Sequence, residues 1–201
     1  MAMKTVIDFL SETMVRVRHR PVGAQVTVPS LAVAEYPAAL PVNQTEESDF
    51  LVYSGKKLTV RQDSTTQRLS FYDAQTDALI LEEAKPCSAY PSSHDKGAFT
   101  VSQDFLTPEG EGLYGLGQIQ NGVMNWRGHS ASLVQANQTI ATPFLLSTRG
   151  YGLFWDNTSQ TAFGDFEELI PAANLFHPDG HQAGLVADYF DDANFDNYER
   201  T

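Results

Sequence analysis

The residues best suited to a chemical role lie between Gly112 and Asn157, in a stretch rich in amide side chains and glycine. They are Gln118, Asn121, Asn125, Trp126, Arg127, Gln135 and Asn137. Amide and guanidinium groups can donate hydrogen bonds to hydroxyls, and amides can also accept them. An indole ring offers a flat apolar face to the C–H side of a sugar. The stretch therefore predicts a surface that binds carbohydrate, and no residue in it is assigned a catalytic role.

Two of these residues have structural alternatives that the sequence leaves open. Trp126 either stacks on a sugar or is a partly buried packing residue. Arg127 either hydrogen-bonds a hydroxyl or forms a salt bridge inside the fold. Tyr151 and Trp155 have apolar neighbours in a predicted hairpin, so packing is the preferred interpretation for both.

The sequence argues against several other kinds of site. Gly115 and Gly117 neither open a helix nor precede a Lys-Ser/Thr pair, so a phosphate loop is excluded. Cys87 is the single cysteine, and no intramolecular disulfide can form. The five histidines lack helical pairing and cysteine companions, so no metal site is predicted; they are His19, His94, His129, His177 and His181. No cofactor is expected.

Strand patterns dominate the elements that must position these residues. Apolar and basic residues alternate over 14–18, and 57–62 alternates similarly. Hairpins are predicted over 69–81 and over 142–156, while 34–48 and 85–97 are predicted to be loops. Gly115 and Gly117 within an apolar strand indicate a bulge or a close backbone approach. The pattern predicts an all-β fold of antiparallel strands, either a β-sandwich or a barrel.

The length and the net charge of the chain limit the number of domains and the kinds of binding partner that can be expected. The chain has 201 residues, enough for one medium domain, and a formal net charge of −12. Nucleic acid and anionic membranes require a cationic face, so neither is an expected partner. No apolar run is long enough to span a bilayer. Residues 1–10 do not resemble a signal peptide, so the compartment stays open between the cytoplasm and secretion with the signal removed.

The motifs of the 112–157 stretch resemble a known family when taken together. Tyr114-Gly-Leu-Gly-Gln118, Asn121-Gly122 and Pro143-Phe-Leu-Leu-Ser147 occur in the order seen in family 31 glycoside hydrolases, most closely in the α-xylosidase branch. Val15-Arg-Val-Arg-His19 is similar to that family's first "RVR" strand. The likeness covers about residues 6–170. It implies a galactose-mutarotase-like supersandwich over 1–180, with the catalytic (β/α)8 barrel and its two Asp residues absent from this chain.

A second resemblance concerns the acidic end of the chain, where 161–201 holds nine Asp or Glu residues against one Arg. Gly184 to Phe190, followed by Asp191 to Phe195, is similar to the opening strand of a protective-antigen-type sugar-binding module. Residues 181–201 are therefore predicted to begin such a module. An ordinary acidic terminal strand is the alternative. An incomplete sandwich also predicts self-association or low stability of the isolated chain.

The family resemblance implies the non-catalytic amino-terminal domain of a retaining α-glycosidase acting on xyloglucan-type or other α-linked oligosaccharides. Its loops would shape the substrate pocket together with the missing barrel, and Asn137 lies where some relatives place an Asp that touches substrate. A stand-alone carbohydrate-binding or assembly module is one alternative. An aldose 1-epimerase is another, although the family's Asn-His strand motif is missing and the chain is short for that fold.

Overall fold

The computed structural model describes residues 3–22, 30–91, 98–157, 159–164, 189–190 and 198–200. The chain divides into two compact units, Met1–Phe163 and Gly164–Thr201. Every regular element in the described residues is a β-strand, and every pairing is antiparallel. This architecture confirms the predicted all-β class, and no (β/α)8 barrel occurs in the described part of the chain.

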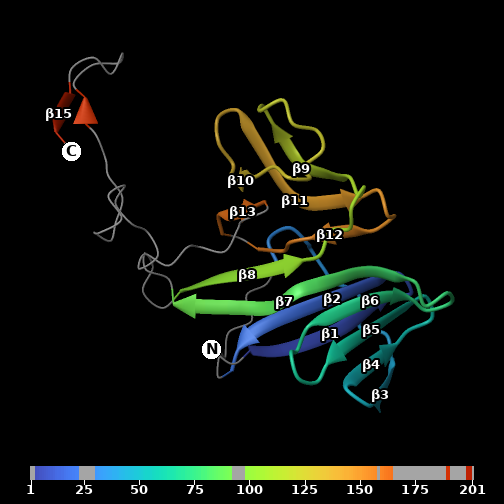
Figure 1. Ribbon diagram of the computed structural model, residues 1–201. Coiled ribbons are helices and arrows are strands. Elements are labelled where there is room, and N and C mark those ends of the chain that lie inside the picture. Colours follow the sequence, from blue (N-terminus) through green and yellow to red (C-terminus); the bar gives the residue numbers. More distant parts are fainter. Residues whose placement is uncertain are drawn as a thin grey trace. The chain divides into compact units, whose positions relative to one another are not determined.

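The first layer of Met1–Phe163 is a six-stranded meander in the order β3-β4-β5-β6-β7-β8 (Figure 1). Its strands are β3 (Asn43–Glu47), β4 (Phe50–Ser54), β5 (Leu58–Asp63), β6 (Leu69–Asp73), β7 (Leu79–Pro91) and β8 (Phe99–Phe105). The turns β5–β6 and β6–β7 are closed by the side chains of Asp63 and Asp73, whose Oδ1 atoms each accept two backbone N–H bonds.

A hairpin of β1 (Met3–Ser11) and β2 (Met14–Pro21) lies against this sheet (Figure 1). The core between them contains Phe9 of β1, Val60 of β5 and Leu69 of β6, each at most 2% exposed. The basic residues of β2 are held by β1, because Arg16 and Arg18 both donate hydrogen bonds to Oδ2 of Asp8. Burial opposes ionisation of Asp8, but these two guanidinium groups keep its pKa below the usual value.

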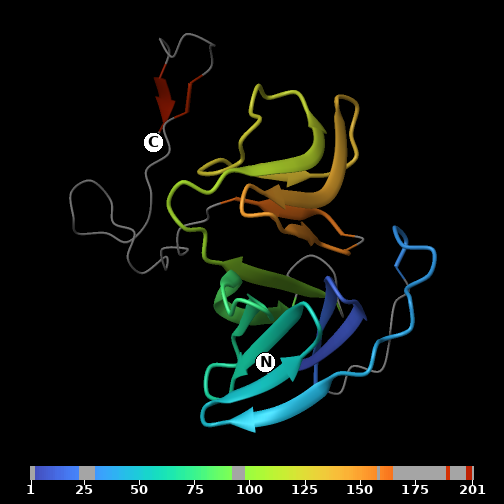
Figure 2. The ribbon, with the colours of Figure 1, turned by 90° about the vertical axis from the view of Figure 1, so that its right-hand side faces the viewer.

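The second layer contains the residues of the predicted carbohydrate surface. It consists of a three-stranded sheet in the order β12-β11-β9 and a short β10–β13 pair (Figure 2). These strands are β9 (Leu113–Ile119), β10 (Ala131–Leu133), β11 (Thr139–Ser147), β12 (Gly152–Phe154) and β13 (Thr161–Phe163). Leu113, Leu116, Trp126, Leu133 and Leu145 form its core, and Phe163 packs against them.

Both predicted hairpins are confirmed, since β6 pairs with β7 and β11 pairs with β12. The two predicted loops are partly wrong. The 34–48 region ends in β3, an entirely exposed edge strand whose polar sequence Asn-Gln-Thr-Glu-Glu has no apolar alternation to reveal it. In the 85–97 region, β7 continues to Pro91, because bulges on either side of Lys85 accommodate Pro86 in the strand.

In the unit Gly164–Thr201, the structure describes one antiparallel pair of short strands, β14 (Tyr189–Phe190) and β15 (Tyr198–Arg200). The domain boundary predicted at 180/181 lies outside the described residues, as does most of the predicted opening strand of the sugar-binding module.

Candidate functional site

The strand that carries the Tyr-Gly-Leu-Gly-Gln motif has an unusual backbone. Gly115, Leu116 and Gly117 all have positive φ, at 113°, 65° and 95°. A β-carbon added at Gly115 would lie 2.4 Å from the Phe144 carbonyl oxygen, and one at Gly117 would lie 2.0 Å from the Ile140 carbonyl oxygen. The partner strand β11 bulges here, since its pairing jumps from Ala141 to Leu145 while β9 advances from Gly117 to Gly115. The bulge and close approach expected from the glycines are confirmed.

This kink decides which side chains of β9 face the core. Leu113 and Leu116 are both buried, although an odd spacing of three would place them on opposite faces of a regular strand. The positive-φ residues turn Leu116 inward at 3% exposure and leave Tyr114 and Gln118 outside.

Three of the seven predicted site residues, Asn125, Trp126 and Arg127, are fixed near the beginning of β9. The loop after β9 folds back so that the Asn125 side-chain oxygen accepts the backbone N–H of Leu113 at 3.0 Å. Arg127 donates to the carbonyls of Pro108 (2.6 Å), Glu111 (3.3 Å) and Thr107 (3.4 Å). Its guanidinium therefore fastens the segment before β9 and forms no salt bridge with the described residues.

Trp126 lies in the core of the second layer, 3% exposed. Its ring meets Phe163 edge-on at 6.4 Å between centroids, and its Nε1–H donates to the Gly115 carbonyl at 3.1 Å. A ring buried to this extent offers no free face to a sugar, so its position favours the packing alternative.

The other four predicted residues, Gln118, Asn121, Gln135 and Asn137, lie near the opposite end of the sheet. Ile119 at the end of β9 pairs with Thr139 at the start of β11, which brings the segments around 118–121 and 135–139 together. Gln135 exchanges two hydrogen bonds with the backbone of Ala141, and Asn121 accepts the N–H of Val123. Gln118 and Asn137 are exposed and make no side-chain hydrogen bond to the described residues. The two amides are thus available to a ligand.

A buried carboxylate next to the motif has no counterpart among the residues singled out from the sequence. Glu111 is 3% exposed, and its Oε1 accepts the hydroxyls of Tyr151, at 2.6 Å, and Ser147. Burial and the bond to Glu111 raise the pKa of Tyr151 to about 12. This cluster ties Glu111, two residues before β9, to the end of β11 and to the turn between β11 and β12. The sequence holds no signal for it, because Glu111 sits in a polar Pro-Glu-Gly-Glu-Gly run typical of a solvated loop.

A second buried carboxylate lies in the first layer, opposite a histidine. Glu83 is 2% exposed, and its Oε2 accepts the backbone N–H of Leu69 at 2.8 Å. His19 Nε2 lies 3.9 Å from Glu83 Oε1, and His19 Nδ1 pairs with the Thr5 hydroxyl at 3.0 Å. Burial lowers the pKa of His19 and raises that of Glu83 to about 7, so both groups are driven toward their neutral forms. His and Glu are the residue types an epimerase needs, but here their side chains are only 15% and 3% exposed.

The raised pKa of Glu83 predicts that the stability of the folded chain depends on pH. Its folded pKa of about 7 exceeds the ordinary 4.5, so the folded chain binds more protons than the unfolded chain between those values. The stabilisation is complete below about pH 4.5 and is lost as the pH rises through 7. Glu83→Gln keeps an acceptor for Leu69 and removes the titration. We expect urea unfolding to show the variant gaining about 2 to 3 kcal/mol relative to wild type between about pH 5 and pH 8.

Exposed Glu46 on β3 supplies the matched control, because Glu46→Gln removes a carboxylate without touching the buried pair. The difference between wild type and Glu83→Gln also cancels the opposite contribution of His19, whose stabilisation is lost as the pH falls below 6.5. If the free energy of unfolding changed with pH in the same way for wild type and Glu83→Gln, the pH dependence could not be assigned to Glu83.

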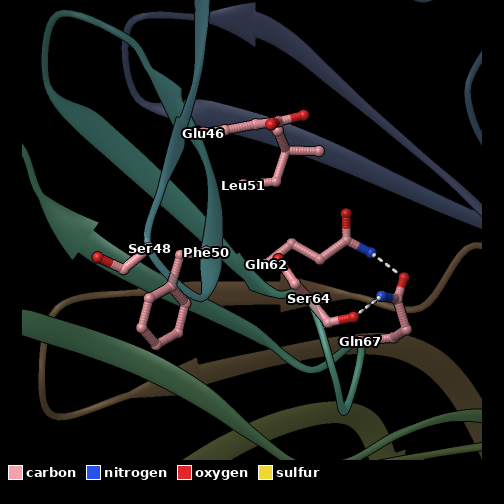
Figure 3. A pocket seen from close by; sticks show the side chains of 7 residues that line it. All are labelled: Glu46, Ser48, Phe50, Leu51, Gln62, Ser64 and Gln67. Atoms are coloured by element: carbon pink, nitrogen blue, oxygen red, sulfur yellow. Dashed lines mark hydrogen bonds between the residues drawn. The ribbon is translucent and has the colours of Figure 1, made fainter.

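A shallow hollow of about 210 Å³ lies on the first layer, between the β3–β4 and β5–β6 turns (Figure 3). Phe50, 38% exposed, supplies an aromatic ring, but the two amides beside it are already paired. Gln62 donates to Gln67 at 3.0 Å, and Gln67 donates to the Ser64 carbonyl at 2.9 Å. The hollow therefore offers a sugar fewer free donors than the Gln118–Asn137 end of the second layer.

The described residues were searched for metal-binding groups and for membrane-spanning helices. They contain no group of three or more His, Cys, Asp or Glu side chains placed to hold a metal ion. They also contain no helix long and apolar enough to cross a membrane.

The chain is similar to several glycosidases of known name. It is 26% identical to an α-xylosidase of Saccharolobus solfataricus over 163 residues, which is 76% of this chain and 22% of the relative. The structure matches the family 31 α-xylosidase of Xanthomonas citri with a TM-score of 0.73 at 32% identity, covering 92% of this chain and 21% of that one. It matches a soil-metagenome α-xylosidase complexed with xylose with a TM-score of 0.68 at 25% identity, covering 80% and 26%. The chain thus spans about a fifth to a quarter of these relatives.

The family model for the glycosyl hydrolase 31 N-terminal galactose mutarotase-like domain matches residues 4–163. That range begins at β1 and ends at β13, and it includes the kinked β9 strand, the looped-back Trp126 and the exposed amides. The chain belongs to the family of glycosyl hydrolase 31 N-terminal galactose mutarotase-like domains.

Proposed function

We propose that this chain is the non-catalytic amino-terminal part of a longer retaining α-glycosidase, with α-xylosidase activity preferred and α-glucosidase activity next. In this proposal the catalytic carboxylates lie in the part of the protein outside this chain. The second layer contributes the rim of the substrate pocket and contacts the sugar beyond the bond that is cleaved. Family membership and the named α-xylosidase relatives support the reaction class.

The observation that carries the proposed contact is the pair of free amides, Gln118 and Asn137, at one end of the β9–β11 ladder. Both are exposed, and neither side chain is bonded to a described residue. The backbone beneath them is shaped by the β9 kink and by the two hydrogen bonds of Gln135 to Ala141. Free amides suit hydroxyl recognition because their donors and acceptors are not already used within the chain, although each side chain loses rotamer freedom on binding.

The rest of the predicted site supports these two amides in our proposal. Asn121 shapes the turn after β9, and Asn125 and Arg127 anchor the returning loop. Trp126 is its internal support. A sugar would then meet Gln118 and Asn137, and the anchoring residues would act on affinity through their position.

Kinetics of the longer protein test this role. We expect Gln118→Ala and Asn137→Ala each to raise KM for an α-xyloside by about 3- to 10-fold with kcat nearly unchanged, since each loses one ground-state hydrogen bond worth about 1 kcal/mol. Gln44→Ala removes an amide that is also exposed, on edge strand β3, and is expected to change neither constant. An unchanged KM in both site variants would refute the contact with the sugar. Faster cleavage of α-glucosides than of α-xylosides would identify the longer protein as an α-glucosidase.

A stand-alone carbohydrate-binding module is the competing proposal. It requires a site complete within this chain, whereas the Gln118–Asn137 end offers two donors and no exposed aromatic plate from Trp126. The hollow beside Phe50 has the plate but uses its amides internally. Neither arrangement favours autonomous binding.

A further inference from the structure

The β1–β2 hairpin has one face that packs and one face that carries charge. Ile7 of β1 and Val15 and Val17 of β2 pack against the core of the first layer. Because side chains alternate along a strand, the residues between them point away from that core. This second face, termed the basic stripe, holds Lys4, Arg16, Arg18 and Arg20. Its four positive charges stand out in a chain whose formal net charge is −12.

One end of the basic stripe is closed by contacts within the chain. Oδ2 of Asp8 accepts hydrogen bonds from Arg16 at 2.9 Å and from Arg18 at 2.8 Å. The Tyr36 ring covers Arg16, whose guanidinium carbon lies 4.4 Å from the ring centroid. The Tyr36 hydroxyl in turn donates to Asp156 at 2.5 Å. The groups at this end are therefore already paired with one another.

The other end of the basic stripe is open. Lys4 lies directly opposite Arg20 in the β1–β2 ladder, and such cross-strand neighbours have β-carbons about 5 Å apart. Neither cation forms a hydrogen bond or an ion pair with any residue that the structure describes. Arg18 lies two residues from Arg20 on the same face, about 7 Å away along the strand, and its side chain is 40% exposed.

This arrangement is unfavourable unless an anion joins it. Like charges directly opposite each other on neighbouring strands destabilise the pairing of those strands. A bound anion between Lys4 and Arg20 would replace this repulsion by two attractions. The planar guanidinium group also matches the two oxygens of a carboxylate, so the arginines favour an oxyanion over a halide.

We propose that Lys4, Arg18 and Arg20 bind the carboxylate of an acidic sugar, a uronic acid residue of an oligosaccharide. Val6 is half-buried and lies opposite Arg18 on the same face, where it offers an apolar contact to the C–H side of the sugar ring. The choice of a sugar as the carrier of the carboxylate rests on the proposed function, in which the chain is part of a glycosidase. The placement of the anion depends only on the hairpin.

Nucleic acid and anionic membranes fit the basic stripe less well than a short acidic oligosaccharide. Both spread many charges over a wide area, so they would also meet the negative charge of the rest of the chain. An exposed charge is screened beyond about 8 Å at physiological ionic strength. A ligand with a few carboxylates therefore interacts mainly with the stripe itself. Inorganic phosphate is the small-ligand rival, and it makes no use of Val6.

An NMR titration of the 201-residue chain tests the site. The probe is a trimer of galacturonic acid, and a neutral galactose trimer is the matched uncharged ligand. We expect the acidic trimer to shift the backbone amide signals of β1 and β2 in a saturable way, with a Kd of about 1 mM or lower. The neutral trimer is expected to leave these signals unchanged.

Single substitutions locate the binding. Arg20→Gln and Lys4→Gln are each expected to weaken binding of the acidic trimer by about 3- to 10-fold, since each removes one charge-assisted hydrogen bond. Both variants relieve the like-charge contact, so they are expected to fold as well as wild type. Lys57→Gln removes an exposed charge outside the stripe and is expected to leave Kd unchanged. Val6→Ala is expected to weaken binding of the trimer but not of inorganic phosphate.

Three results would overturn the proposal. The first is the absence of a saturable shift with the acidic trimer. The second is an equal loss of affinity in Lys57→Gln and Arg20→Gln, which would mean that binding follows overall charge. The third is phosphate binding as tight as that of the trimer, with Val6→Ala unaffected, which would assign the stripe to simple anions. The titration involves no cleavage, so a longer protein without α-glycosidase activity would reject the proposed function and leave the carboxylate site standing.

Discussion

Alanine at Gly117 is expected to abolish the native second layer. The new β-carbon would lie 2.0 Å from the Ile140 carbonyl oxygen and 2.7 Å from the Thr142 nitrogen, and both atoms belong to the backbone of the adjacent strand. The residue would also have to keep φ at 95°, which an L side chain rarely adopts. Neither strand can move without breaking the β9–β11 ladder. We expect a loss of about 4 kcal/mol or more, a large share of the stability of an ordinary domain.

Gly122→Ala is the matched control for this substitution. Gly122 also has positive φ, at 73°, but an added β-carbon would meet nothing within 4 Å. Its cost is therefore limited to the backbone conformation, about 1 kcal/mol. Guanidinium unfolding monitored by tryptophan fluorescence compares the two variants. Equal losses would show that the contact with β11 is unimportant and that only the dihedral angle matters.

The second large effect concerns Trp126. Trp126→Ala removes the largest side chain from the core of the second layer and is expected to lower the free energy of unfolding by about 3 to 5 kcal/mol. The residue is 3% exposed, packs edge-on against Phe163 and lies among Leu113, Leu116 and Leu145. Loss of sugar binding in this variant would follow from unfolding of the loop and would not identify Trp126 as a sugar contact.

Trp126→Phe separates packing from recognition. The smaller ring keeps most of the apolar contact but gives up the Nε1–H bond to the Gly115 carbonyl, so we expect a loss of about 1 to 2 kcal/mol. In the longer protein this variant is expected to retain its KM if the loop stays folded. A KM raised more than that of Gln118→Ala, with thermal stability unchanged, would instead place the Trp126 ring against the sugar.

The sequence was informative where a residue type has one dominant structural use. Gly115 and Gly117 in an apolar strand predicted a bulge or close approach, and the structure has both. Alternating apolar residues and polar turns predicted the two hairpins. The order of the motifs predicted the family, which the match over residues 4–163 confirms.

The candidate site was predictable as a segment but not as a geometry. The loop after β9 folds back to Leu113 because Asn125 captures a backbone N–H twelve residues earlier, and no local pattern encodes such a return. This return separates Asn125, Trp126 and Arg127 from Gln118 and Asn137. Tryptophan and arginine suit both buried and ligand-binding positions, so their types alone could not decide between the two.

Buried carboxylates were the hardest features to predict. Glu83 and Glu111 are 2% and 3% exposed, yet each lies within two residues of another glutamate, Glu82 and Glu109, as is common in solvated segments. Their partners, the Leu69 N–H and the hydroxyls of Ser147 and Tyr151, come from residues 14 to 40 positions away. Such burial depends on tertiary contacts that no short window of sequence contains.

Calorimetric titration of the 201-residue chain with xylose and xyloglucan oligosaccharides tests the central claim, that this domain supplies one side of a pocket completed by the rest of a longer glycosidase. The free amides Gln118 and Asn137 alone provide too few contacts to hold a sugar, so we expect no saturable heat from the chain. Saturable binding to the chain, lost in Gln118→Ala or Asn137→Ala, would show a complete site within these residues. That result would contradict the account and identify the chain as an autonomous carbohydrate-binding module.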